Sequence, residues 1–258
     1  MKEEKTLVQK QFSKHPEKYR DEQLFSAGDD LRAMIQAVPL TGKEKVLDIG
    51  TGAGHTAITF SSFTRECIGL DVTKEMVEVA TNYAKERGVS NVEFRQGNAE
   101  SLPFPDGTFD IVTCRYAAHH FANVRKVVQE ISRVLKTGGH FLLIDHYAPE
   151  DISLDRFINQ LNKMRDPSQV RESSLSEWKD MFAENYSQYQ EVLKWDLPIE
   201  FASWIERAGT TPEVKQKIVS LLQNADPLCK ETFNPVFDEQ NDPISFCLKA
   251  ILLHGSKD

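Results

Sequence analysis

The residue types most suited to chemistry gather in a glycine-rich turn. Gly50, Gly52 and Gly54 follow an apolar run and precede a helical pattern. Glycines at such a strand–turn–helix junction let backbone N–H groups approach a ligand, and the start of the helix favours an anionic group. The turn therefore predicts a site for a nucleotide-like cofactor. Because residues 52–57 also satisfy the dinucleotide fingerprint, the glycines alone do not identify that cofactor.

Two carboxylates discriminate between cofactors. Asp71 stands at the end of the next β-branched run, where a carboxylate can accept both hydroxyls of an adenosine ribose. Asp48 lies just before the first glycine, where it would repel the phosphates of a dinucleotide. It would instead attract the ammonium and sulfonium groups of S-adenosylmethionine. The pair favours S-adenosylmethionine, with a nicotinamide-dependent oxidoreductase as the weaker alternative.

The elements that must position these residues alternate along the first half of the chain. Such alternation of β-branched runs with helical patterns is typical of a parallel sheet wound with crossover helices. Helices are expected after Thr73 and after Asn123, the second ending at the glycines of 136–139. Strands are expected at 46–49, 66–70, 92–95, 110–114 and 140–144.

The two ends of the chain follow a different pattern. The N-terminal extension predicts a short helix near 6–12 and a longer one that contains Leu24 and Phe25 and ends at Pro39. After residue 147 the alternation stops. Ser174 and Glu177 form a capping box for a helix through Ala183, 189–195 predicts a sixth strand, 198–228 is helical, and 244–253 is the last strand. Whether 232–237 pairs with that strand is left open.

Composition excludes several classes of partner. The 258 residues are those of one α/β domain, and Lys+Arg 31 against Asp+Glu 39 gives a net charge of −8, which disfavours nucleic acid. The sequence has no apolar run long enough for a membrane span and no apolar signal core at its N-terminus, which predicts a cytoplasmic location. None of the seven histidines has an HxxxH or HExxH spacing, so the sequence gives no support for a metal site and none is assigned.

Residues 48–54 resemble the D-x-G-x-G-x-G motif of the class I S-adenosylmethionine-dependent methyltransferases. The resemblance covers about residues 40–147, and within the family it is closest to the menaquinone and ubiquinone C-methyltransferase branch. Further motifs at 115–121, 145–149 and 170–174 resemble an uncharacterised bacillus-type subgroup. The segments 95–104, 109–112 and 133–139 are similar to the family's G-D-A-x-x-L-P-F, F-D-x-V and R-V-L-K-P-G-G motifs.

The resemblance implies a Rossmann-like, doubly wound, seven-stranded sheet, mostly parallel with an antiparallel last strand and with helices on both faces. It also implies a role for each matching residue. The loop residues Gly50, Thr51, Gly52 and Gly54 would meet the methionine end of the cofactor, and Asp48 would meet its ammonium side, directly or through water. Asp71 would hold the ribose, Val72 and Met76 the adenine ring, Asn98 and Ala99 the adenine edge, and the backbone of Arg115 the ammonium. Asn98 departs from the usual Asp, which removes a charge from the adenine contact.

The chain is expected to form one methyltransferase domain, 1–258, in which the N-terminal lid and the substrate cap close an acceptor pocket. Its parts would be a helical lid at 1–39, a cofactor-binding half at 40–147, a helical insertion and substrate cap around the sixth strand at 148–228, and a C-terminal strand region at 229–258. Candidates for acceptor contacts are aromatic (Phe12, Tyr19, Trp178, Trp195, Phe201 and Trp204) or basic (Lys163, Arg165 and Arg171).

Methyl transfer is an in-line displacement, so few residues are obligatory beyond a base for a weak nucleophile. His119 and His120 after the fourth strand and His146 after the fifth are the candidates. The favoured acceptor is a small apolar or aromatic molecule. The alternative is a protein that binds S-adenosylmethionine or its demethylated product for regulation, without turnover. The atom methylated and a homodimeric state are left open.

Overall fold

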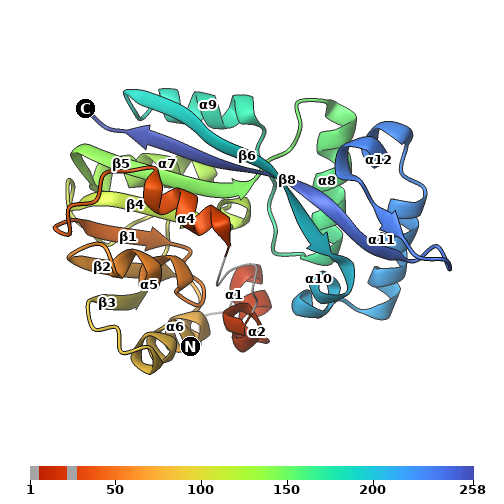
Figure 1. Ribbon diagram of the computed structural model, residues 1–258, viewed down its shortest axis with the longest axis horizontal. Coiled ribbons are helices and arrows are strands. Elements are labelled where there is room, and N and C mark those ends of the chain that lie inside the picture. Colours follow the sequence, from red (N-terminus) through yellow and green to blue (C-terminus); the bar gives the residue numbers. More distant parts are fainter. Residues whose placement is uncertain (1–5, 22–27) are drawn as a thin grey trace.

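A computed structural model describes residues 6–21 and 28–258. One sheet forms its centre, with the strand order β3-β2-β1-β4-β5-β8-β6 (Figure 1). The strands are β1 (Lys45–Ile49), β2 (Glu66–Asp71), β3 (Val92–Gln96), β4 (Phe109–Arg115), β5 (Leu135–His146), β6 (Gln188–Glu200) and β8 (Pro243–Ser256). β1 to β5 pair in parallel, whereas β8 is antiparallel to β5 and β6. The expected Rossmann-like sheet with an antiparallel last strand is confirmed, and a two-residue strand, β7 (Val236–Phe237), is added to it through β8.

Helices cover both faces of the sheet. In β1 successive side chains alternate, so that Val46 packs with α4 (Asp29–Gln36) and α5 (His55–Ser61), and Leu47 packs on the opposite face. The opposite face carries α7 (Val124–Val134) and α9 (Leu175–Ala183). α6 (Lys74–Glu86) packs against β2 and β3. We call β1 to β5 with α4 to α7 the cofactor half.

A second hydrophobic core lies where β6 and β8 continue beyond the other strands. Leu197 and Ile199 of β6 and Phe246 and Leu248 of β8 pack there against four helices, grouped to one side of the sheet in Figure 1. We call these helices and strand ends the cap lobe. Its helices are α8 (Ile152–Arg165), α10 (Phe201–Ala208), α11 (Pro212–Gln223) and α12 (Pro227–Phe233).

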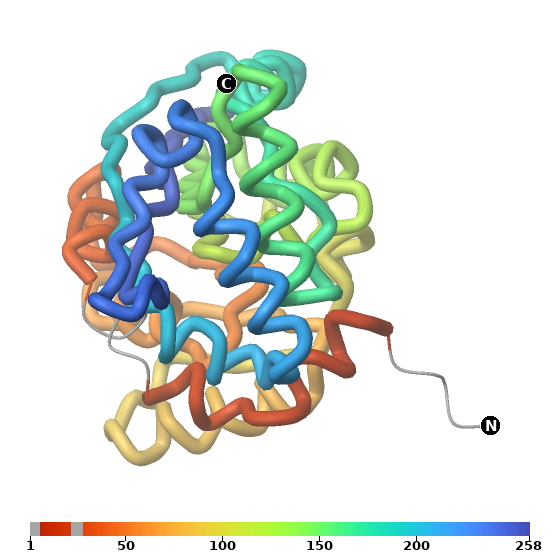
Figure 2. Tube along the Cα trace, turned by 90° about the vertical axis from the view of Figure 1, so that its right-hand side faces the viewer, coloured from red at the N-terminus to blue at the C-terminus, as the bar shows by residue number. Residues whose placement is uncertain are grey.

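The N-terminal helices lie between these two regions. α1 (Leu7–Phe12) and α2 (Pro16–Asp21) lie between α6 of the cofactor half and α10 of the cap lobe in both views (Figures 1 and 2). Gln9 Nε2 donates to the Val72 carbonyl at 2.9 Å, and Gln11 Nε2 donates to the Ala208 carbonyl at 2.8 Å. α1 is therefore hydrogen-bonded to both regions.

Several predicted boundaries are wrong. The longer N-terminal helix is present as α4, which begins at Asp29 and ends at Gln36, three residues before the predicted end at Pro39; Leu24 and Phe25 lie outside the described residues. Pro16 begins α2, a helix that was not predicted. The helix after Asn123 ends at Val134, because Leu135 already pairs with Phe109 in the sheet.

Towards the C-terminus the strands are longer than predicted. β6 continues to Glu200, whose side chain accepts from the backbone N–H groups of Ala202 and Ser203 and so caps α10. The helical segment therefore begins at Phe201. Residues 236–237 do pair with the last strand, which settles the pairing left open above. The capping box of Ser174 and Glu177 is confirmed. No helix in the described residues is long and apolar enough to cross a membrane.

Candidate active site

A cavity of about 480 Å³ runs across the carboxyl ends of the strands. Following the sheet order, its wall takes residues from β2, β1, β4, β5, β8 and β6 in turn, and the N-terminal helices contribute Phe12 and Tyr19. The strand residues are Leu70 and Asp71, Ile49, Arg115, His146, Leu248 and Ile199. Because ligands of open α/β sheets bind at this edge, the cavity is the candidate active site.

The glycine turn forms the floor at the end of β1. Gly50 has a φ of +64°, and a Cβ there would lie 2.4 Å from the Cβ of Ala117, so only glycine lets the turn pack against the segment after β4. Gly52 lines the cavity, and a Cβ there would meet nothing within 4 Å. Thr51 also lines the wall, whereas Gly54 packs beneath it against the Phe94 ring.

Asp71 holds its carboxylate at the cavity wall. Its Oδ2 accepts from the Gly52 N–H at 2.9 Å and its Oδ1 from the Thr73 N–H at 2.8 Å. Burial raises the pKa of Asp71, an effect that these backbone hydrogen bonds oppose. Two carboxylate oxygens offer about four acceptor positions, so room remains for the hydroxyls of a ribose. Val72, Met76, Asn98 and Ala99 line the same end of the cavity.

Asp48, predicted to meet the ammonium side of the cofactor directly or through water, does not line the cavity. It is 1% exposed, and its carboxylate accepts from the hydroxyls of Thr51 and Thr113, both at 2.7 Å. Burial raises the pKa of Asp48 to about 6, against the effect of the two hydroxyls. Thr51 lines the cavity, so its hydrogen bond to Asp48 connects the buried carboxylate to the cavity wall. Asn98 Oδ1 accepts from the Glu100 N–H at 2.9 Å, which fixes the turn after β3.

Arg115 has a structural role that sequence reasoning missed. Its Nε and one terminal nitrogen donate to the carboxylate of Asp30 at 2.8 and 3.1 Å, and its side chain is 3% exposed. This buried, bidentate ion pair joins the end of β4 to α4. No local sequence signal links the two residues, because they are far apart in the chain.

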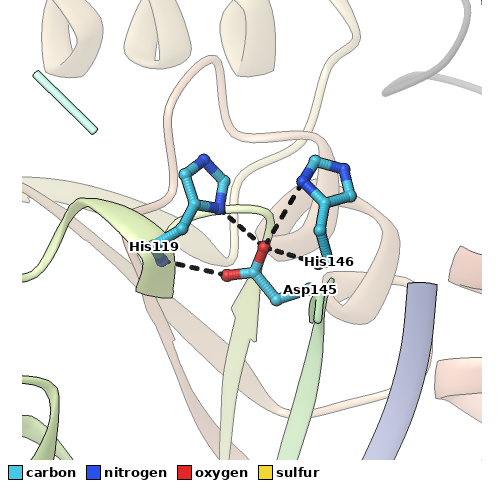
Figure 3. A group of neighbouring side chains, drawn as sticks. All are labelled: His119, Asp145 and His146. Atoms are coloured by element: carbon cyan, nitrogen blue, oxygen red, sulfur yellow. Dashed lines mark hydrogen bonds and ion pairs between the residues drawn. The ribbon is translucent and has the colours of Figure 1, made fainter. Parts of the chain in front are cut away.

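His119, in the short 3₁₀ helix Ala118–His120, forms a pair with Asp145 of β5. His119 Nδ1 lies 2.6 Å from Asp145 Oδ1, and the carboxylate also accepts from the backbone N–H groups of His119 and His146. Figure 3 shows the carboxylate between the two imidazole rings, with the outer nitrogen of each ring turned away from it. Asp145, which was not predicted as a site residue, thus orients the imidazole of His119 at the cavity wall.

The three candidate histidines differ in protonation. Burial lowers the pKa of His119, but the charge and hydrogen bond of Asp145 outweigh it, and the pKa lies above its usual value. Burial and the neighbouring His119 lower the pKa of His120 to about 3. The pKa of His146 also falls to about 3, because burial exceeds the attraction of Asp145. Of the three, only His119 is paired so that its protonated form is stabilised.

A buried carboxyl group lies behind His146. Glu172, in the segment between α8 and α9, has its Oε1 3.6 Å from His146 Nδ1, and it accepts from Asn162 Nδ2 at 2.6 Å. Burial raises the pKa of Glu172 to about 8, so the group is mostly neutral at pH 7. Sequence reasoning missed Glu172 as well, although 170–174 is one of the motifs that carried the resemblance.

His119, Asp145 and His146 are also the described residues that could hold a metal ion. Their ligand atoms lie within 4.8 Å of one another, and two imidazoles with a carboxylate suit Zn²⁺ or a similar ion. No sequence spacing indicated this group. The distance of 2.6 Å between His119 Nδ1 and Asp145 Oδ1 is that of a hydrogen bond. In this structure the two side chains therefore form a histidine–carboxylate pair.

Only some of the residues predicted to contact the acceptor line the cavity. Phe12, Tyr19, Trp204 and Arg165 line the cavity, whereas Trp178, Trp195 and Phe201 do not. Trp178 and Phe201 are buried in the two cores. Arg171 pairs with Asp155 and Glu177 at the surface, and Lys163 donates to the Gln169 carbonyl. The structure also brings Arg207 and His55 to the wall, which sequence reasoning did not single out.

Comparison with known proteins identifies the family. A family model for the methyltransferase domain matches residues 40–225. The uncharacterised methyltransferase YcgJ of Bacillus subtilis is 57% identical over 95% of this chain and 97% of its own. Its crystal structure matches with a TM-score of 0.87 at 56% identity, covering 89% of this chain and 99% of that one.

Two further relatives extend the comparison. The crystal structure of a putative methyltransferase from Bacillus halodurans matches with a TM-score of 0.84 at 36% identity over 89% of this chain and 99% of its own. The demethylmenaquinone methyltransferase of Lactococcus lactis is 39% identical over 46% of this chain and 48% of its own. The open space at Gly52 fits the methionine end of the family's cofactor, and the remaining acceptor positions of Asp71 fit its ribose. The chain belongs to the methyltransferase domain family and is an S-adenosylmethionine-dependent methyltransferase.

Proposed function

We propose that the protein methylates a small apolar or aromatic molecule that binds between the sheet edge and the cap lobe. Asp71 would hold the ribose of the donor beside β2, while the cavity continues past β5 to Leu248 of β8 and Ile199 of β6. The donor therefore leaves the far end of the cavity to the acceptor. Phe12 and Trp204 give that end the apolar and aromatic lining that suits a flat ligand.

A relative supports this class of acceptor. The Lactococcus lactis enzyme is named for demethylmenaquinone, an apolar aromatic molecule. The similarity covers less than half of either chain, so it supports the class of acceptor and not that molecule. The named acceptor of this relative and the net charge of −8 both favour a small molecule over nucleic acid as the acceptor. A cytoplasmic location stays a prediction from the sequence.

The observation that carries the proposed chemistry is the pair of His119 and Asp145. S-adenosylmethionine, when bound, supplies an electrophilic methyl group. His119 would take the proton from the acceptor with Nε2, since its Nδ1–H is directed to Asp145. The Asp145 carboxylate would stabilise the imidazolium that forms. His120 and His146, with pKa values of about 3, are poorer bases and would shape the wall.

The lid and the cap have proposed roles of their own. Residues 1–39 would form the lid, because α1 hydrogen-bonds to Val72 beside the donor site and to Ala208 of α10. Residues 148–228 would form the substrate cap, since α8 and α10 bring Arg165 and Trp204 to the cavity. Closure of α1 over the cavity would exclude water from the reacting atoms.

Calorimetry with S-adenosylhomocysteine tests the donor site. We expect micromolar binding by the wild-type protein, and loss of at least about a hundredfold in Asp71→Ala, because two hydroxyl acceptors are removed. Asp180→Ala, an exposed carboxylate on α9, is the matched control and should bind normally. Absence of binding by the folded wild-type protein would refute the donor site.

Methyl transfer to an acceptor panel tests turnover. Phenols and quinols are incubated with methyl-labelled S-adenosylmethionine, and transfer of label to any of them supports the enzyme. Tight binding of S-adenosylhomocysteine with no transfer to any acceptor would favour the regulatory alternative.

A further inference from the structure

Arg165 is a partly buried cation that lines the cavity. It ends α8 and has a side chain that is 13% exposed. Its Nε donates to the Trp204 carbonyl at 3.1 Å, and its guanidinium lies 5.3 Å from the centre of the Trp204 ring. A terminal nitrogen lies 3.8 Å from Asp166 Oδ2, too far for a hydrogen bond.

The remaining N–H donors of Arg165 are available at the cavity wall. A guanidinium has five N–H donors, and one of them is used by Trp204. Within 6–21 and 28–258 no other hydrogen bond from Arg165 is formed. Because Arg165 lines the cavity, its remaining N–H groups are placed to donate to an anionic group of a ligand bound there.

A second guanidinium belongs to the same wall. Arg207 of α10 lines the cavity, and its charge contributes, after burial, to lowering the pKa of Arg165. Tyr19 interacts with both charges, since Arg165 and Arg207 each oppose the rise that burial causes in its pKa. The cap-lobe end of the cavity thus carries positive charge, whereas the opposite end has Asp71 and Glu100. The cavity is acidic at one end and basic at the other in a chain of net charge −8.

The geometry of the N–H donors of Arg165 indicates which chemical group of a ligand would fit them. A guanidinium presents its N–H groups in a planar fork, which matches a carboxylate in two parallel hydrogen bonds. Asp166 lies beside Arg165 and offsets part of its charge. A singly charged carboxylate is therefore a better complement than a doubly charged phosphate.

We propose that Arg165, assisted by Arg207, binds the carboxylate of an acidic acceptor whose aromatic or apolar body lies against Trp204. This inference rests on the function proposed above and narrows its acceptor to a small aromatic or apolar acid. Arg165 contacts Trp204, whose ring packs against Phe246 of β8, so the binding group lies on the β8 side of the cavity. The acid group would thereby anchor the molecule while its nucleophilic atom faces His119.

Matched acids and amides test the proposal. Benzoate, para-hydroxybenzoate and para-hydroxycinnamate, each with its amide, are titrated into protein saturated with S-adenosylhomocysteine and followed by ligand-observed NMR. We expect at least one acid to bind about tenfold or more tightly than its amide. In Arg165→Gln that preference disappears, while Arg165→Lys keeps part of it because the charge remains. Arg156→Gln, an exposed arginine on the same helix, keeps the wild-type preference.

Two results would overturn the proposal. The first is equal affinity for acid and amide in the wild-type protein, including no measurable binding of any of them. The second is a large rise, about tenfold or more, in the Kd for S-adenosylhomocysteine in folded Arg165→Gln and Arg165→Lys. That result would assign the guanidinium to the carboxylate of the methyl donor. Failure of the proposed function is distinct, because the wild-type protein would then not bind S-adenosylhomocysteine at all.

Discussion

The cofactor half and the cap lobe build their parts of the cavity in different ways. In the cofactor half, Gly50 follows β1, Asp71 ends β2 and His119 follows β4, so each group is placed by the end of a parallel strand. In the cap lobe, Arg165 comes from the end of α8 and Trp204 from the middle of α10. Their positions depend on how four helices pack around the ends of β6 and β8. The comparison teaches that strand order alone locates the donor site, whereas the acceptor site requires tertiary packing.

The strongest test of this division is His119→Gln. We expect kcat to fall by about 10²- to 10⁴-fold, because the general base is lost, while the Kd for S-adenosylhomocysteine stays within about twofold. Turnover needs the neutral imidazole, so wild-type activity should fall as the pH drops through a pKa above the usual 6.5 or so. Asp145→Asn removes the main cause of the raised pKa and should move that midpoint to lower pH.

His140→Gln is the control for His119. His140 lies at the other end of the β4–β5 pairing, against His254, and does not line the cavity. Its replacement should leave kcat unchanged. A parallel loss of cofactor affinity in His119→Gln would show that the two ends of the cavity are not separable.

The sequence predicts the cofactor half because its signals are local. A glycine turn after a β-branched run must lie at the carboxyl end of a strand, and Asp71 at the next strand end must lie beside it. The ion pair of Arg115 with Asp30 and the approach of Glu172 to His146 have no such signal, since each joins segments that only the fold brings together. The N-terminal extension was predicted only in part. The expected short helix at 6–12 is α1, but the apolar pattern gave no sign of α2, which Pro16 begins, or of the start of α4 after Gly28.

Gly50→Ala tests whether the donor site depends on a close backbone approach. The positive φ should cost about 1–2 kcal/mol in the free energy of unfolding, and the overlap with Ala117 about 1–3 kcal/mol more. We expect the Kd for S-adenosylhomocysteine to rise by tenfold to about a hundredfold as the turn shifts. Gly42→Ala shares the positive φ, with a value of +82°, but has no atom within 4 Å of its new Cβ. In chemical denaturation, the free energy of unfolding of Gly42→Ala should fall only by the cost of the positive φ. An equal fall in both variants would contradict the packing argument.

Glu172→Gln tests the buried network on the cap side of His146. The folded pKa of about 8 is raised above the unfolded value by burial, and it is opposed by His119 and reinforced by Asp145. The resulting stability is present below a pH of about 4 and is lost as the pH rises through about 8. We therefore expect wild-type Tm to fall by several degrees between about pH 5 and pH 9. The Tm of Glu172→Gln should fall much less over the same range. Glu231→Gln, an exposed control on α12, should follow the wild-type curve, and an unchanged slope in Glu172→Gln would refute the assignment.

The smallest expected effects come from α1, which touches both regions. Gln9→Ala removes the hydrogen bond to Val72 beside the donor site, and Gln11→Ala removes the bond to Ala208 in the cap lobe. One such bond is worth about 0.5–1.5 kcal/mol, or roughly twofold to tenfold in an affinity. Gln9→Ala should therefore raise mainly the Kd for S-adenosylhomocysteine, and Gln11→Ala mainly the KM for the acceptor. Because the two residues lie on one short helix and lose the same side-chain amide, each variant is the control for the other. If both variants change both constants equally, α1 moves as a rigid lid, and the donor and acceptor ends of the cavity close together.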